Sequence, residues 1–120
     1  MNYKEERPWG RFENLLELPT CKVKQLVVLP GQQLSLQSHV YRDEHWIVVQ
    51  GTATVSCLPK YEDAILQYGS HIFIPRGSKH RLANFSNQDL VLVEVQVGES
   101  FLESDITRFS DIYNRDATET

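Results

Sequence analysis

The sequence predicts a single all-β domain, either a sandwich or a barrel, and three observations support this prediction. Short runs rich in Val, Ile, Leu and Thr recur along the chain, separated by Gly, Pro and polar clusters, as strands joined by turns are. No segment before Gly98 sustains a helical period of apolar residues. Two frames of glycines and potential metal ligands lie on these runs, one from Gly31 to Gly51 and one from Gly69 to Asn84.

Each expected strand is a short apolar run that stops where a residue turns the chain. The turn signals are Pro30-Gly31, Gln50-Gly51, Pro59, Tyr68-Gly69, Pro75-Arg76-Gly77, Ser86-Asn87 and Gly98. They give strands at residues 23–29, 34–39, 44–49, 52–58, 64–67, 72–74, 81–85 and 90–97. Residues 104–113 are expected to hold a short helix, with Ser104 or Asp105 as its cap. The domain then spans residues 1–115, and residues 116–120 are expected to form a flexible tail.

Composition and charge narrow the function classes. A chain of 120 residues fits one domain and is long enough to bury a core without disulfides. The net charge is -4 and Lys and Arg form no run, so neither nucleic acid nor an anionic membrane is expected as a partner. No apolar stretch approaches the ~20 residues of a membrane span, and the polar N-terminus lacks the apolar core of a signal peptide. We therefore expect a cytoplasmic protein in which Cys21 and Cys57 are reduced thiols.

The two frames contain a candidate set of metal ligands: Gln37, His39, Glu44 and His80. Gln37 and His39 lie two residues apart on one expected strand, so their side chains share a face. Glu44 begins the next strand and His80 lies on a strand far along the chain, so all of them converge inside a barrel. This donor set suits a borderline divalent ion such as Zn²⁺, Co²⁺, Mn²⁺, Ni²⁺ or Fe²⁺, whereas Ca²⁺ favours more oxygen ligands. The alternative is a sheet whose polar side chains satisfy one another without a metal.

The other two histidines are expected outside the ligand set. His45 adjoins Glu44, and neighbours on a strand face opposite sides. His71 lies outside both frames, so a surface or edge position is expected. Trp46 shares the parity of Glu44 and belongs either to the core or to the wall of the cavity. The glycines of the frames are expected to supply tight turns and positive φ angles at Gly31, Gly51, Gly69 and Gly77.

The two frames resemble the double motif of the cupin proteins, with Gln37 where a histidine is usual. This resemblance implies a jelly-roll β-barrel, also called a double-stranded β-helix. Further stretches resemble the type II mannose-6-phosphate isomerase domain, which in bacteria often follows a mannose-1-phosphate guanylyltransferase domain. The resemblance covers about residues 7–115 and is carried by Arg7-Pro8-Trp9-Gly10, Lys22-Val23-Lys24, Leu34-Ser35-Leu36-Gln37, Glu44-His45-Trp46, Gly51-Thr52-Ala53, Ile74-Pro75, His80-Arg81-Leu82, Glu94-Val95-Gln96 and Asp105-Ile106-Thr107-Arg108-Phe109.

The resemblance implies an aldose–ketose isomerase that interconverts mannose 6-phosphate and fructose 6-phosphate in the metabolism of polysaccharide precursors. The reaction moves a proton between C1 and C2 and needs a base, a metal to stabilise the oxyanion, and a cation for the phosphate. Arg81 matches the family and is the first candidate for the phosphate, although strict alternation requires a bend to bring it inward. Glu94 is the expected base if its side chain faces inward, and Lys24 is the third candidate catalytic residue. The remaining candidate cations are Lys22, Arg42 and Lys79.

Two departures from the family pattern leave alternatives open. The family shows a histidine run where this chain has His39, Val40 and Tyr41, and the two changed residues are expected at the mouth of the site. The alternative function is a non-catalytic module that binds a metal and a sugar phosphate, and a third possibility is an iron-dependent dioxygenase. The chain is too short for a guanylyltransferase domain, so that activity is not expected. The family and base rates imply a homodimer.

Overall fold

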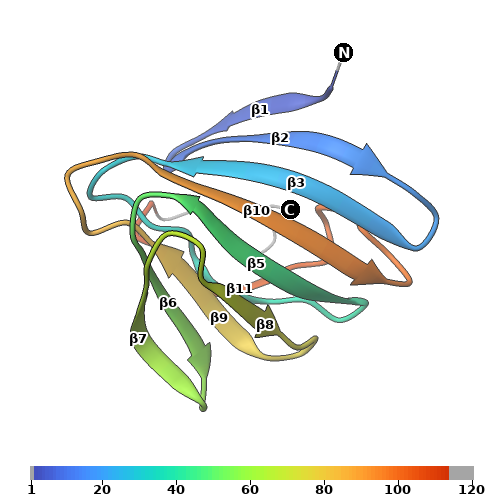
Figure 1. Ribbon diagram of the computed structural model, residues 1–120. Helices are drawn as coiled ribbons and strands as arrows, with labels where there is room; N and C mark the ends of the chain where they lie inside the picture. The colour runs from blue at the N-terminus through green and yellow to red at the C-terminus, as the bar shows by residue number, and fades with distance from the viewer. Residues whose placement is uncertain (1, 114–120) are drawn as a thin grey trace.

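The computed structural model describes residues 2–113, which form two antiparallel sheets that face each other (Figure 1). The large sheet has the strand order β1-β2-β3-β10-β5-β8 and the small sheet has the order β11-β4-β9-β6-β7. The strands are β1 Lys4–Arg7, β2 Gly10–Glu17, β3 Cys21–Val28, β4 Leu36–Ser38, β5 Arg42–Gln50, β6 Ala53–Leu58, β7 Tyr61–Leu66, β8 His71–Ile74, β9 Lys79–Ala83, β10 Leu90–Gly98 and β11 Thr107–Ser110.

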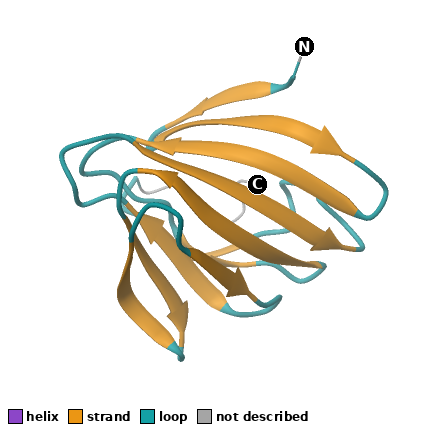
Figure 2. Cartoon of the chain, viewed as in Figure 1, coloured by secondary structure: helices purple, strands orange, loops and turns teal. Residues whose placement is uncertain are grey.

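The expected all-β class is confirmed, since the described residues contain strands and loops and no helix (Figure 2). It follows that no helix in this part of the chain is long and apolar enough to cross a membrane. The expected helix within residues 104–113 is wrong, because Thr107–Ser110 forms strand β11 along the edge of β4. Long-range pairing with an open strand edge overrides a weak local signal for a helix. The expected tail at 116–120 lies outside the described residues.

Two strands near the N-terminus were not expected from the sequence. Strand β1 consists only of charged residues, and β2 continues the sheet beyond β3. An edge strand with both faces near solvent has no apolar alternation, and charges on it protect the sheet from pairing with other chains. Strand β1 therefore escapes a search for apolar runs, whereas β2 is an inner strand that places Phe12 in the core.

The inner face of the large sheet changes from apolar to polar along the strands. At one end it packs the core with apolar side chains such as Val28, Leu90, Leu92 and Val48. Towards the other end the inward positions are polar and still buried, and they are Lys22 and Lys24 on β3, Glu94 and Gln96 on β10, and Arg42 and Glu44 on β5. The apolar half stabilises the barrel by burying hydrocarbon, and the polar half is left for a site.

The register of strands β3, β10 and β5 sets the neighbours within the polar half. Glu94 lies opposite Lys24 on one side and Trp46 on the other, and Gln96 lies between Lys22 and Glu44 in the same way. Opposed residues in a sheet project to the same face about 5 Å apart. The polar groups are thus ordered across three central strands.

The outer face of the large sheet carries exposed apolar side chains, among them Ile47, Val49, Phe73 and Val97. A face of this kind is compatible with the expected homodimer, which stays a prediction. The two cysteines are free, as expected, with Cys57 buried and Cys21 partly buried.

The frame glycines have the expected positive φ angles, which are 78° at Gly31, 83° at Gly51, 87° at Gly69 and 80° at Gly77. Gly51 has a second constraint, because a Cβ atom placed on it would lie 2.7 Å from the carbonyl oxygen of Asp89. At Gly69 a Cβ atom would meet nothing within 4 Å. An alanine at Gly69 would therefore introduce backbone strain alone, whereas an alanine at Gly51 would introduce both backbone strain and steric overlap.

We expect Gly51→Ala to lower the free energy of unfolding by about 3 kcal/mol, of which roughly 1 kcal/mol is positive-φ strain and about 2 kcal/mol is the overlap with Asp89. Gly69→Ala carries only the strain and should cost about 1 kcal/mol. Urea denaturation of both variants measures the difference. Equal losses would contradict the close approach of the two turns at Gly51.

Candidate metal centre

The structure brings the expected ligands together at the polar end of the barrel. His39, Glu44 and His80 are buried, and one potential ligand atom from each lies within 4.8 Å of the others. Ligand atoms 2.0 to 2.2 Å from one ion are at most about 4.4 Å apart. The three side chains would therefore need to move only slightly closer together to coordinate one ion. Gln37 is the direct cross-strand partner of His80 and is also buried. The fourth expected ligand therefore projects to the same face.

Backbone carbonyl groups orient both imidazole rings. His39 Nδ1 lies 2.6 Å from the carbonyl oxygen of Asp105, and His80 Nδ1 lies 3.0 Å from that of Ser78. A carbonyl only accepts hydrogen bonds, so Nδ1 carries the proton in each neutral ring and Nε2 presents a lone pair. This arrangement is the usual support of a metal-bound histidine.

An orphaned acceptor shows that the pocket suits a cation. His80 Nε2 is buried and has no hydrogen-bond partner among the described residues, and leaving such a group unpaired costs about 1–3 kcal/mol. His39 Nε2 lies 3.4 Å from Glu44 Oε2. Two imidazole lone pairs and a carboxylate that converge in this way are the donor set of a borderline divalent ion. The residues present therefore fit the metal that the cupin resemblance implies.

Glu44 is ionised at neutral pH. Burial alone would raise its pKa, but the combined attraction of His39, His80 and Arg42 lowers the pKa below its ordinary value. Its Oε2 accepts a hydrogen bond from Arg42 Nε at 2.9 Å, and its Oε1 accepts one from Trp46 Nε1 at 2.9 Å. The carboxylate is thus fixed by two donors and retains lone pairs for a further ligand. Trp46 both belongs to the core and lines the cavity.

Both histidines are in the neutral form that a metal requires. Burial lowers the pKa of His39, and it lowers the pKa of His80 to about 4. Neither ring then has to lose a proton near pH 7 before it can act as a ligand.

Asp105 supports the loop that carries His39, a role that the sequence did not indicate, since it offered this residue as a helix cap and as part of a stretch that resembles the family. Its carboxylate accepts hydrogen bonds from the backbone N–H groups of Val40 and Tyr41, each at 2.9 Å. Its carbonyl group holds His39, whose own carbonyl oxygen accepts a bond from Gly77 N at 2.8 Å. The loop that carries His39 is therefore tied from two sides. A chain separation of 66 residues between Asp105 and His39 explains why no local pattern reveals this contact.

The cavity beside the ligand set has a volume of about 80 Å³ and is rich in charge. Glu94, the expected base, lines it and is buried, and burial together with the charge of Glu44 raises its pKa to about 7. Gln96 Nε2 donates to Glu94 Oε1 at 2.6 Å. Lys24 also lines the cavity. Two expected catalytic residues therefore face the same space as the ligand set.

Three charged residues that line this cavity were not anticipated as site residues: Arg7, Glu103 and Arg108. Arg108 reaches it because β11 places this residue opposite Gln37. Glu103 lies in the connection between β10 and β11 and contacts Lys24. Arg108 lies in the region that was expected to be a helix, and Glu103 directly precedes that region. Arg7 lies on β1, a strand that was not expected either. The approach of these residues to the site was therefore not visible from the sequence.

Arg81 does not lie in the cavity with the other candidate catalytic residues, Glu94 and Lys24. Strand β9 pairs with β6 without interruption, and His80 and Leu82 face inward. The bend that an inward Arg81 requires is absent, and this residue does not line the cavity.

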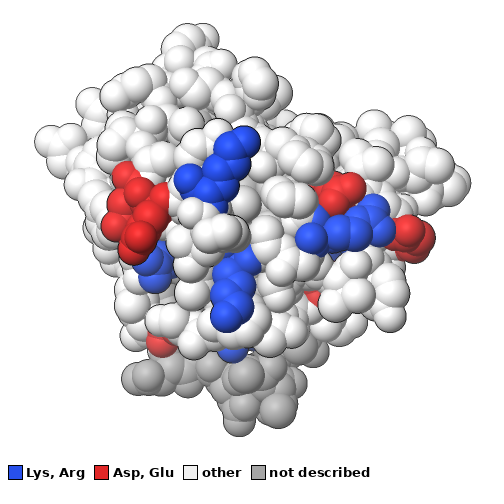
Figure 3. All heavy atoms as spheres, turned by 90° about the horizontal axis from the view of Figure 1, so that it is seen from below, with Lys and Arg blue, Asp and Glu red and all other residues white. Residues whose placement is uncertain are grey.

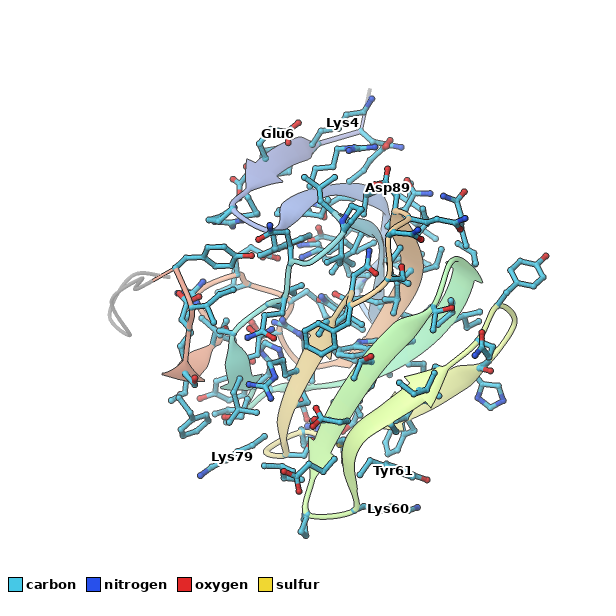
Figure 4. The ribbon with its side chains drawn as sticks, turned by 90° about the vertical axis from the view of Figure 1, so that its left-hand side faces the viewer. Lys4, Glu6, Lys60, Tyr61, Lys79 and Asp89 are labelled. Atoms are coloured by element: carbon cyan, nitrogen blue, oxygen red, sulfur yellow. The ribbon has the colours of Figure 1, made fainter. Side chains whose placement is uncertain are left out.

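Lys79 is exposed at the end of the same strand (Figure 4), and its ammonium group lies over the ring of Phe109. From the side of the small sheet, the Lys and Arg side chains are scattered and do not form a continuous patch (Figure 3).

His45 and His71 lie where the sequence predicts, away from the ligand set. His45 is exposed on the outer face of the large sheet, where its ring contacts Phe73 with centroids 4.8 Å apart. His71 is exposed on β8, which is an edge strand of that sheet.

The lowered pKa of His80 predicts a pH-dependent stability in chelated protein. Below pH 6.5 the unfolded chain binds a proton that the folded protein does not bind until about pH 4. The stabilisation is therefore complete above pH 6.5 and is lost as the pH falls towards 4, by roughly 3 kcal/mol. Urea denaturation between pH 7 and pH 4 should show this loss. It should shrink in His80→Gln and persist in the exposed control His45→Gln, and an unchanged slope in His80→Gln would contradict the assignment.

Comparisons with known proteins agree with the architecture and identify the family. A double-stranded β-helix protein from Klebsiella pneumoniae has a TM-score of 0.70 at 18% identity, covering 82% of this chain and 83% of that one, which shows the shared fold. The alginate biosynthesis protein AlgA of Pseudomonas aeruginosa is 44% identical over 92% of this chain and 23% of its own length. The xanthan biosynthesis protein XanB of Xanthomonas campestris is 44% identical over 93% of this chain and 24% of its own length.

The chain thus spans about a quarter of the length of these curated relatives. A family model described as mannose-6-phosphate isomerase C-terminal matches residues 1–111, which is nearly the whole chain. The protein belongs to the mannose-6-phosphate isomerase C-terminal family.

Proposed function

We propose that this chain is a metal-dependent isomerase that interconverts mannose 6-phosphate and fructose 6-phosphate. One observation carries the proposal: a buried ligand set and a carboxylate with a raised pKa line or adjoin the same cavity. Both are parts that an aldose–ketose isomerase needs. The description of the family supports the substrate, and two relatives are named for polysaccharide biosynthesis.

The metal would be held by His39, Glu44 and His80, with Gln37 as the fourth ligand. When bound, the ion supplies a Lewis acid that polarises the carbonyl and hydroxyl oxygens at C1 and C2. The donor set suits Zn²⁺, Co²⁺, Mn²⁺ or Ni²⁺. The protein contributes rings that are already oriented and neutral, so little rearrangement is needed to load the site.

Glu94 is the proposed base. Its ionised carboxylate would accept the proton from C2 of mannose 6-phosphate and return it to C1. A second proton moves from the hydroxyl oxygen at C2 to the oxygen at C1, which leaves a hydroxyl group at C1 and the carbonyl group at C2. A pKa of about 7 suits a group that must both accept and donate a proton near neutral pH. Gln96 holds Oε1 of this carboxylate, so Oε2 is the oxygen left to take the proton.

Arg42 stabilises negative charge in the cavity. Its guanidinium group binds Glu44 and also donates from Nη1 to the carbonyl oxygen of Leu102 at 3.1 Å. The group is buried and permanently charged, and preorganised positive charge of this kind favours an enediolate. Arg81 is left out of the mechanism because its side chain lies outside the cavity.

Val40 and Tyr41, which stand where the family shows histidines, lie outside the proposed ligand set. Both are exposed at the loop beside His39, and their attachment to Asp105 uses backbone N–H groups. The position of that loop therefore does not depend on these side chains. Their exposure supports the second candidate function, a module that binds the sugar phosphate without turnover. Substitutions at the entrance of the cavity would change contacts with the substrate and leave the proposed metal ligands in place.

A coupled assay for fructose 6-phosphate formation from mannose 6-phosphate tests the function. We expect turnover with added Zn²⁺, Co²⁺ or Mn²⁺, none after chelation, and a loss of at least 100-fold in His80→Ala, since a missing ligand costs at least as much as a missing support of one. His45→Ala is the matched control and should retain full activity. Absence of turnover in folded, metal-loaded protein would exclude this reaction and favour the binding module.

Replacing the proposed base separates binding from chemistry. Glu94→Gln should lower kcat by 10²-fold or more, as loss of a general base does, while the metal content per chain is unchanged. In the unaltered protein kcat/KM should rise with pH through about 7 as the carboxylate ionises. A Glu94→Gln variant with near-normal kcat and the same pH profile would assign the proton transfer to another group.

A further inference from the structure

Three cations of the barrel wall bind one short stretch of the connection between β10 and β11. Lys22 Nζ donates to the carbonyl oxygen of Phe101 at 3.3 Å, and Arg42 Nη1 donates to that of Leu102 at 3.1 Å. Lys24 Nζ donates to the carboxylate of Glu103 at 2.7 Å. Consecutive residues of this stretch are thus each held by a different buried cation, at the polar end of the barrel.

The carboxylate of Glu103 is shared between two buried ammonium groups. Its Oε2 lies 2.7 Å from Lys24 Nζ and 3.6 Å from Lys22 Nζ. The other carboxylate near Lys22 is the exposed Glu17, at 4.0 Å, which is too far for a hydrogen bond. Buried lysines are rare and need an anionic partner. Here a single oxygen of one carboxylate faces two ammonium groups. An anion with more negative charge and more oxygen atoms would neutralise both groups and accept more of their hydrogen bonds.

The lysines lie on a central strand, whereas the carboxylate lies in a loop and is more exposed. Lys22 and Lys24 belong to β3, which is paired on both sides in the large sheet, and their side chains are only 7% and 6% exposed. Glu103 lies outside any strand, and its side chain is 40% exposed. The two ammonium groups are therefore preorganised, and the carboxylate between them is supplied by a loop that lies outside the sheet.

We propose that Lys22 and Lys24 form a subsite for a phosphate monoester dianion, and that Glu103 occupies it in the free protein until the ligand displaces it. The identity of the sugar that carries the phosphate rests on the proposed function, whereas the anion site itself does not.

The position of the subsite fits a hexose 6-phosphate. Lys24 lies on β3, Glu94 is its direct neighbour on β10, and Trp46 follows on β5. Neighbouring strands are about 4.8 Å apart, so the lysines lie roughly 10 Å from the strand that carries Glu44. In a hexose 6-phosphate the phosphate lies at one end and C1 and C2 lie at the other. A sugar bound across β10 places its reacting carbons between Glu94 and the ligand set.

If Glu103 competes with the ligand for the two lysines, removing its charge should strengthen the binding of phosphate. Isothermal titration of the chelated protein with inorganic phosphate is the test. Glu103→Gln keeps the shape and removes the competing charge, so the Kd for phosphate should fall about fivefold or more, as expected for a lost competing contact near a partly buried charge. Glu103→Ala should act in the same direction. Lys24→Met should weaken binding at least tenfold.

The matched control is Glu99→Gln. It removes one negative charge from the same connection, but Glu99 forms its ion pair with the exposed Arg76, whereas Glu103 pairs with Lys22 and Lys24. Its Kd for phosphate should stay within twofold of the unaltered protein. A Kd that is unchanged or higher in Glu103→Gln, or an equal gain in Glu99→Gln, would overturn the subsite.

The subsite and the isomerase can fail independently. If phosphate binding responds as predicted but no sugar phosphate is isomerised, the subsite stands and the proposed reaction falls. If turnover is present but KM for mannose 6-phosphate is unaffected in both Glu103→Gln and Lys24→Met, the reaction stands and the subsite falls.

Discussion

The candidate centre depends on two hydrogen bonds from imidazole Nδ1 atoms to backbone carbonyl groups. The carbonyls of Asp105 and Ser78 fix the rings of His39 and His80 and leave both Nε2 atoms as acceptors. Burial then keeps the rings neutral, because it disfavours the charged form. Only in this state does the orphaned lone pair of His80 become a reason to bind a cation. In the other tautomer each Nδ1 lone pair would face a carbonyl oxygen, and each Nε2 would carry a proton and offer no lone pair to a cation.

The barrel divides its interior between stability and chemistry. The central strands β3, β10 and β5 pack apolar side chains at one end and bury six charged or amide groups at the other. The buried charges are tolerated because they are paired, as Arg42 is with Glu44 and Lys24 is with Glu103. A substrate or metal that enters this region exchanges one set of ionic partners for another, so the cost of exposing or burying a bare charge is avoided.

The sequence indicated which residues converge at the candidate centre, because their spacing and strand periodicity are local properties. Gln37 and His39 share a face by parity, and the exclusion of His45 follows from the same rule, which the structure confirms. The sequence did not reveal strand β11 or the contacts of Asp105, Glu103 and Arg108. These features depend on pairing with β4 and on contacts between residues more than 60 positions apart in the chain. Arg81 shows the limit of resemblance, since a matched motif does not determine which way a side chain points.

The most direct test of the central claim is the protonation of the histidine ring nitrogens, observed by long-range ¹H–¹⁵N correlation spectra of chelated protein at pH 7. The account predicts that His39 and His80 both carry the proton on Nδ1, and that added Zn²⁺ shifts the Nε2 resonances of these two rings while His45 and His71 are unchanged. A proton on Nε2 of either buried ring, or a Zn²⁺ response confined to the exposed histidines, would contradict the account.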